Sequence, residues 1–220
     1  LIGGVLKKDL HLPHTQSLLW SYLDDYDFIL TPLPNHLFQR DNTAFVYDGL
    51  SVNPMAKPAR KRETLHSRTI WNFHPRFADA GLNFYYGNDD LHHEPATIEG
   101  GDILVIGNGA VMVGMGERTT PQGVEVLARK YFQFGGGQIT KVIVVELPKT
   151  RALMHLDTAM TMIDKDAFSC YPYLPDHLRS YTLEPIGDGG EFAVKENEEL
   201  WPVVADAVGV DEMRVLKTPI

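Results

Sequence analysis

The chain has 220 residues, of which 44% are hydrophobic and 22% are charged, a composition typical of a globular protein with a sizeable core. Its formal net charge of -9 and pI near 5.4 argue against a nucleic-acid-binding or anionic-membrane-binding surface, since both need clustered Lys and Arg. We therefore expect a small, partly cationic molecule as the binding partner.

The cysteine content and the hydropathy of the sequence indicate the cellular compartment. Cys170 is the only cysteine, so no intrachain disulfide can form, which is typical of a reducing compartment. No apolar run approaches the roughly 20 residues needed to span a bilayer, and residues 1–10 hold neither an initiator Met nor a signal-peptide core. We predict a cytoplasmic protein without a membrane partner, and a sequence that begins inside a longer protein or at a processed end.

The first predicted elements are a short helix and a strand within residues 16–30, followed by a break at Pro32 and Pro34. A first β-hairpin comes next, because two β-rich runs flank Asp48-Gly49, a pair that suits a type I′ turn. Its strands cover residues 43–47 and 50–53, and the helix and strand after it cover residues 58–73 and 83–86.

A second hairpin is predicted around Asn108-Gly109, again a strong turn signal. The helix after it has Thr119 or Thr120 as its cap and Pro121 in its first turn, and it ends at residues 135–137. The strands of this group cover residues 103–106, 110–115 and 142–147.

A third hairpin is predicted around Lys165-Asp166, a weaker polar turn between apolar runs. Its strands cover residues 158–163 and 167–171. A helix from Asn197 to Ala207, a stop at Gly209 and a strand over residues 213–216 follow.

The three hairpins form a repeat. An acidic residue precedes each one, Asp41, Asp102 and Asp157, at spacings of 61 and 55 residues, which indicates a recurring β-β-α-β unit. One such unit cannot bury its own sheet face, so the units must pack around a common axis. We predict one α/β repeat domain over residues 28–220 and a separate N-terminal piece over residues 1–27, and we expect a further hairpin beyond Ile220.

Packing around an axis would bring the polar loops at the strand starts together. These loops would then place Asp41, Glu99 or Asp102, and His155 with Asp157 around one pocket. Three local alternatives stay open: an ion pair of Arg40 with Asp41, a plain turn over residues 99–102, and a structural pair of His155 with Asp157.

The chemistry of this cluster favours an organic cation. Zinc sites prefer several His or Cys ligands, whereas these loops offer one His and no Cys. A magnesium or calcium site usually spaces Asp and Asn within one loop. A planar guanidinium pairs bidentately with carboxylates, so we predict a guanidinium or amidine ligand and no metal.

Two arginines follow hairpins. Arg60 and Arg118 could bind the carboxylate of an amino acid, or they could pair locally with Glu63 and Glu117. Cys170 lies within a predicted strand, where a cysteine is usually inert packing.

Five segments carry a family resemblance. LPNHLFQRD, NPMAKPAR, EGGD, MGERT and MHLDT occur in order between Leu33 and Thr158 and resemble the arginine deiminases, which are guanidino-group-modifying enzymes. The resemblance implies a pentein-type α/β propeller of β-β-α-β repeats. About three of the five repeats plus part of a fourth would be present, and residues 1–27 would be the last part of a helical insertion domain.

The resemblance also implies roles for single residues. Asp41 and Asp157 would hold the substrate guanidinium, and His155 would be the general acid and base, oriented by Glu99. Further residues would line the pocket and bind the amino-acid end of arginine: Asn35, Phe38, Arg60 and Arg118. The implied reaction of arginine catabolism is hydrolysis of L-arginine to L-citrulline and ammonia through a cysteine amidino-thioether, without a cofactor. Asp102 would support its loop.

Two departures from the family pattern matter. Gln39 stands where the family usually has Thr, beside the site. The family's nucleophile lies in a glycine-rich segment ending in Cys-Met, which does not occur here, so we expect it beyond Ile220. An agmatine deiminase, an amidinotransferase and a noncatalytic arginine-binding fragment stay open as alternatives, as does a homo-oligomer.

Overall fold

The computed structural model describes residues 2–12, 17–86 and 94–219. The chain divides into two compact units, Leu1–Gln39 and Arg40–Ile220. In the first, β1 (Val5–Leu6) pairs antiparallel with β2 (Phe28–Leu30), and η1 (Lys7–Asp9) and α1 (Leu18–Tyr22) lie between them in the chain. A short helix and a strand were expected here and are confirmed. That residues 1–27 derive from an insertion domain stays a prediction.

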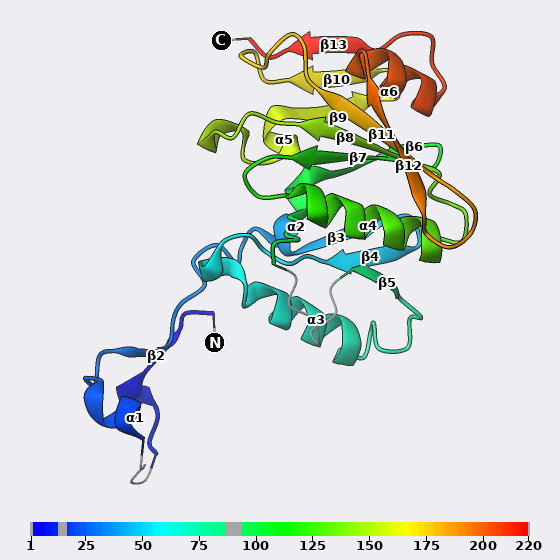
Figure 1. Ribbon diagram of the computed structural model, residues 1–220. Coiled ribbons are helices and arrows are strands. Elements are labelled where there is room, and N and C mark those ends of the chain that lie inside the picture. Colours follow the sequence, from blue (N-terminus) through cyan, green and yellow to red (C-terminus); the bar gives the residue numbers. More distant parts are fainter. Residues whose placement is uncertain (1, 13–16, 87–93, 220) are drawn as a thin grey trace. The chain divides into compact units, whose positions relative to one another are not determined.

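The second unit is built from a recurring hairpin, helix and strand (Figure 1). In each group the hairpin is antiparallel, and its second strand pairs in parallel with the strand after the helix. The first group is β3 (Thr43–Val46), β4 (Gly49–Val52), α3 (Glu63–Phe73) and β5 (Asn83–Tyr86); the second is β6 (Ile103–Gly107), β7 (Ala110–Met115), α4 (Pro121–Phe134) and β8 (Lys141–Glu146); the third is β9 (Met160–Asp164), β10 (Ala167–Cys170), α6 (Leu200–Val208) and β13 (Arg214–Lys217).

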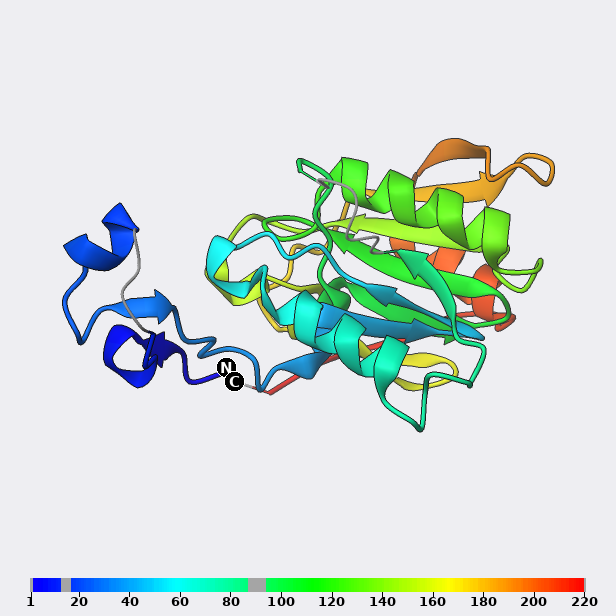
Figure 2. The same cartoon turned by 90° about the horizontal axis from the view of Figure 1, so that it is seen from below.

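This arrangement confirms the predicted β-β-α-β unit. Three such groups lie within the described residues, and their sheets remain open rather than closing into a barrel there. The two views show α3 and α4 pointing the same way in neighbouring groups (Figures 1 and 2). A full set of five repeats stays a prediction.

The hairpin turns follow the backbone preferences of their residues, with one correction. Asn108 and Gly109 both have positive φ, 49° and 76°, as a type I′ turn requires. In the first hairpin Val46 pairs with Gly49, so the turn is Tyr47-Asp48, one residue earlier than predicted. Gly49 serves packing instead, because a Cβ there would lie 2.4 Å from the Tyr85 ring.

The helices begin and end largely where capping residues predict. Thr120 Oγ1 accepts a hydrogen bond from Gly123 N at 3.2 Å, and α4 ends before Gly135. The helix predicted over residues 58–73 is divided into η2 (Pro58–Arg60) and α3. Among the helices of the described residues, none has both the length and the apolar character needed to cross a membrane.

A further hairpin was not predicted. β11 (Ser180–Pro185) pairs antiparallel with β12 (Phe192–Asn197) and with β8, which gives the strand order β12-β11-β8-β7-β6. The prediction of a helix starting at Asn197 is therefore wrong, since Asn197 ends β12 and α6 starts at Leu200. Alternating apolar residues on either side of Gly187 were the signal in the sequence.

Strands β7 and β8 are buried on both faces. Alternate residues point to opposite sides of a strand, and here the two sides belong to two different hydrophobic cores. Met112 and Ile143 pack with α6 and the third group, whereas Val111 and Val142 pack with α4, β3 and β5. The second group is therefore the central layer of the unit, with a neighbouring group on each side (Figure 1).

Truncation of Leu127 should show how much this packing contributes. Leu127 is fully buried on α4, so Leu127→Ala should lower the free energy of unfolding by about 2 to 5 kcal/mol in chemical denaturation. Val126 is its exposed neighbour on the same helix, and Val126→Ala should change stability by no more than about 0.5 kcal/mol. Equal losses in the two variants would contradict the core assignment.

Candidate active site

Helical turns, rather than extended loops, carry the polar residues that precede the hairpins. Asp41 lies in α2 (Gln39–Asn42), Asp102 ends η3 (Gly100–Asp102), and Asp157 lies in α5 (Leu156–Ala159). α2 and α5 lie at the same edge of the stacked sheets (Figure 1). The three groups thus present equivalent turns on one side of the second unit.

His155 and Asp157 lie at the start of a helical turn. His155 is the N-cap residue of α5, and its backbone N–H donates to Thr158 Oγ1 at 3.3 Å. The strand predicted from Thr158 accordingly begins only at Met160. His155 is buried and Asp157 is exposed, so the two side chains differ in their access to solvent.

A hydrogen bond between His155 and Glu99 forms the centre of the site. The distance from His155 Nε2 to Glu99 Oε2 is 2.7 Å, and Glu99 is fully buried. Burial alone would lower the pKa of His155, but the hydrogen bond to Glu99 and the charges of Asp102 and Asp41 raise it. Burial alone would raise the pKa of Glu99, but His155 and Arg118 lower it. Both shifts favour the charged pair.

Asp41 connects this pair to a buried arginine. Its Oδ1 lies 3.6 Å from His155 Nδ1, and its Oδ2 accepts a hydrogen bond from Arg60 Nη1 at 2.6 Å. Arg60 also donates from Nε and Nη2 to the two oxygens of Glu63, each at 2.9 Å. The local pairing of Arg60 with Glu63 therefore exists, but it is buried and continuous with the site.

Arg118 lies close to two glutamates. Arg118 Nη1 lies 3.4 Å from Glu99 Oε2, and its Nε lies 3.7 Å from Glu117 Oε1. Partial desolvation by its surroundings raises the pKa of the exposed Asp157; the charge of His155 opposes this and that of Asp41 adds to it. Asn35 and Phe38 belong to the first compact unit, and their part in substrate binding stays a prediction.

Buried charge is concentrated in this one place. Within the described part of Arg40–Ile220, every buried Asp, Glu, Arg or His belongs to the cluster: Asp41, Arg60, Glu63, Glu99, Asp102 and His155. Burying charge is costly unless it is paired, and here four carboxylates face one arginine and one histidine. The excess of carboxylates suits a cationic ligand.

A metal ion is the alternative cation. Asp41, Glu99 and His155 each offer a ligand atom, and these atoms lie within 4.8 Å of one another. As arranged, however, Glu99 Oε2 is engaged by the His155 ring, and its Oε1 accepts a hydrogen bond from Ala56 N at 3.1 Å. Carboxylate oxygens that already accept hydrogen bonds in this way suit an organic cation with its own N–H groups better than they suit a metal ion.

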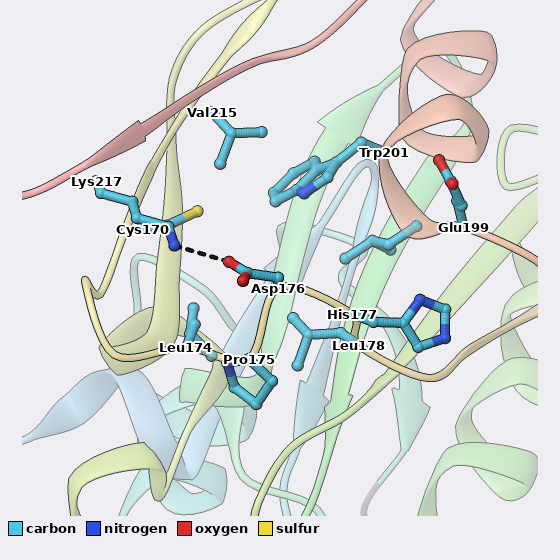
Figure 3. A pocket seen from close by; sticks show the side chains of 11 residues that line it. Cys170, Leu174, Pro175, Asp176, His177, Leu178, Glu199, Trp201, Val215 and Lys217 are labelled. Carbon is cyan, nitrogen blue, oxygen red and sulfur yellow. Dashed lines mark hydrogen bonds and ion pairs between the residues drawn. The ribbon is translucent and has the colours of Figure 1, made fainter.

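Cys170 lies apart from this cluster, in the wall of a cavity of about 400 Å³ (Figure 3). Its neighbours there include Leu174, Trp201 and Val215, and no residue of the cluster lines the cavity. Burial raises the pKa of Cys170 to about 11, although the charge of Lys217 opposes the effect. At neutral pH this residue is a thiol, which suits packing rather than nucleophilic attack.

A family model described as arginine deiminase matches residues 1–220. The chain belongs to the arginine deiminase family. Together with the likeness to solved structures, membership identifies an α/β fold of the pentein type, as predicted.

Several solved structures are similar to this arginine deiminase family member. A cysteine mutant of AgrE in complex with L-arginine has 16% identity and a TM-score of 0.50, over 86% of this chain and 29% of that chain. A dimethylarginine dimethylaminohydrolase mutant from Pseudomonas aeruginosa, complexed with citrulline, has 14% identity and a TM-score of 0.49, over 86% and 72%. A dimethylarginine dimethylaminohydrolase adduct has 21% identity and a TM-score of 0.46, over 66% and 52%. The chain thus spans about half of the last of these.

Sequence reasoning missed one member of the cluster and one of its hydrogen-bond partners. Glu63 was considered only as a surface partner of Arg60, yet it is fully buried. Thr119 was considered as a helix cap, whereas Thr120 is the cap and Thr119 donates a hydrogen bond to Asp102 at 2.6 Å. Only the spacing of Glu63 from Arg60 could have indicated the first, and nothing local marked the second.

The Glu99–His155 pair should give stability a defined pH window. Because the pKa of Glu99 is lowered, its contribution is present above the ordinary value of 4.5 and is lost as the pH falls. Because the pKa of His155 is raised, its contribution is present below the ordinary value of 6.5 and is lost as the pH rises through the raised value. The difference in unfolding free energy between wild type and Glu99→Gln should therefore be largest between these values, as measured by denaturation at several pH values. A difference that keeps growing above pH 8 would contradict the assignment.

Proposed function

We propose that this chain carries the substrate-binding and acid-base groups of an arginine deiminase. The reaction would be hydrolysis of L-arginine to L-citrulline and ammonia through a covalent amidino-thioether. The observation that supports this most strongly is the buried His155–Glu99 hydrogen bond with Asp41 beside the other ring nitrogen. His155 and Glu99 form a charged acid-base pair next to further carboxylates, in a chain that belongs to the arginine deiminase family.

Each group has a proposed part in the chemistry. Asp41 and Asp157 would hold the guanidinium through charge-assisted hydrogen bonds. A cysteine thiolate would attack the guanidinium carbon, and protonated His155 would give its proton to the departing ammonia. Neutral His155 would then take a proton from the water that displaces the cysteine sulfur and releases citrulline. Glu99 would stabilise the imidazolium in each cycle.

The proposed nucleophile is not Cys170. Its buried thiol lines a separate cavity, and its raised pKa disfavours the thiolate. The proposed reaction therefore requires a thiolate from outside these 220 residues. The chain itself would bind arginine through the cluster.

The amino-acid end of the substrate is assigned to Arg118 together with Arg60. Arg118 Nε is buried without a hydrogen-bond partner among the described residues, and a substrate carboxylate would satisfy it. Arg60 is already engaged by Asp41 and Glu63, so its contribution would be mainly electrostatic.

Three alternatives make different demands on these groups. An agmatine deiminase would act on a substrate without a carboxylate, leaving Arg118 Nε unused. An amidinotransferase would need a second amine to accept the amidino group. A noncatalytic module would bind arginine without forming citrulline. Binding and product measurements therefore separate the candidates.

Removal of the Asp157 charge should weaken arginine binding. Asp157 is exposed, so Asp157→Asn should leave the fold intact and raise the Kd for L-arginine by about 10-fold or more in calorimetry, since a hydrogen bond to a charged group is lost. Asp164 is an exposed aspartate in the adjoining hairpin, and Asp164→Asn should leave the Kd unchanged. Equal affinities in wild type and Asp157→Asn would remove Asp157 from the site.

Removal of the Arg118 charge should distinguish arginine from agmatine. Arg118→Ala should raise the Kd for L-arginine by about 10-fold to 100-fold because a charge-assisted hydrogen bond to the carboxylate is lost, and it should affect agmatine much less. Arg179→Ala, which removes an exposed arginine paired with Glu196, is the matched control. An equal loss for both ligands would contradict the assignment of the substrate carboxylate to Arg118, and no loss for either would favour the agmatine deiminase alternative.

A further inference from the structure

Asp102 lies close to the His155–Glu99 pair and is almost completely buried. Its Oδ1 accepts a hydrogen bond from Leu156 N at 2.9 Å, and its Oδ2 accepts one from Thr119 Oγ1 at 2.6 Å. Leu156 directly follows His155 in the chain. Asp102 therefore holds the peptide that carries the histidine.

Thr119 extends this connection to Glu99. Its Oγ1 accepts a hydrogen bond from Glu99 N at 3.2 Å while it donates to Asp102. Three segments that are distant in sequence thus meet through two side chains. The backbone positions of Glu99 and His155 are fixed relative to each other by Asp102 and Thr119.

Two glycines make room for this arrangement. A Cβ at Gly101 would lie 2.7 Å from His155 Nδ1, and a Cβ at Gly114 would lie 2.5 Å from Asp102 Oδ1. Any larger residue would displace the ring or the carboxylate. The close approach of these groups therefore depends on the absence of a side chain at Gly101 and Gly114.

We propose that Asp102 and Thr119 act as positioning residues, a clamp that holds His155 against Glu99 and keeps a negative charge near the imidazolium. Neither residue needs to touch substrate. The proposal deepens the proposed function, since it concerns how the acid-base histidine of that site is set. It assigns to Thr119 a role that its place before a helix does not suggest.

The electrostatics agree with this geometry. The groups whose charges act on His155 are Glu99, Asp102 and Asp41, and Asp157 of its own helical turn also interacts with it. Burial raises the pKa of Asp102 to about 7, and the hydrogen bond from Thr119 opposes this. Loss of the Thr119 hydroxyl would raise the pKa of Asp102 further, so a smaller fraction of Asp102 would carry the negative charge that stabilises the imidazolium.

An NMR pH titration of His155 tests the clamp without any substrate. The chain would carry isotope-labelled histidine, with the His155 signals assigned by their absence from His155→Gln. Asp102→Asn should lower the pKa of His155 because it removes a nearby negative charge, and Thr119→Val should lower it because Asp102 loses the hydrogen bond that favours its charged form. Thr119→Ser keeps the hydroxyl and should retain the wild-type value. Asp206→Asn, which removes an exposed carboxylate paired with Lys141, should do the same.

The outcomes separate positioning from a merely structural role. An unchanged pKa of His155 in Asp102→Asn, or in a folded Thr119→Val, would overturn the proposal. So would a fall in Thr119→Ser as large as that in Thr119→Val. If Thr119→Val does not fold, Asp102→Asn and Thr119→Ser decide by the same criteria, with thermal melts showing that each is native. Because no arginine is used, a failure of arginine binding would count against the proposed function and leave this test intact.

Discussion

The burial of Glu99 is the constraint on which the site depends. A carboxylate that is removed from water needs hydrogen-bond donors from the protein. For Glu99 these are the His155 ring, Ala56 N and Arg118, which lie in three different segments. These donors can meet only if the first three hairpin groups are packed in one particular relation. The hydrogen bond between Glu99 and His155, which favours the protonated histidine, therefore forms only when the three groups are correctly packed.

The fold brings these donors to Glu99 because equivalent parts of each group meet at one edge. The second group is sandwiched between two cores, and its strands β7 and β8 contribute alternate side chains to each. The stack thus has a rigid centre, and the turns that carry Asp41, Glu99 and His155 project from it or from its neighbours. Precise placement of catalytic groups comes more readily from such packed elements than from long loops.

Much of this arrangement could be predicted from local sequence, and the remainder could not. Asn108-Gly109 and the Thr120 cap determine their own backbone conformation, so the second hairpin and α4 were predicted correctly. The helical turn at Leu156 depends on Asp102, more than 50 residues away, and nothing near Leu156 indicates it. Glu63 and Thr119 likewise acquire their roles only through burial among distant partners. Family motifs indicated which residues gather, but the hydrogen bonds that hold them are tertiary.

The β11–β12 hairpin has a consequence for how the molecule assembles. This segment lies between β10 and α6 in the chain, so it belongs by sequence to the third group, yet it completes the sheet of the second through β8. In α-helical repeat proteins, whole modules can be gained or lost because neighbouring modules contact one another mainly through side-chain packing. Here a backbone ladder joins two modules, so deleting or exchanging either would leave a row of peptide groups unpaired. The two groups should therefore be inherited, and should fold, as a single cooperative block.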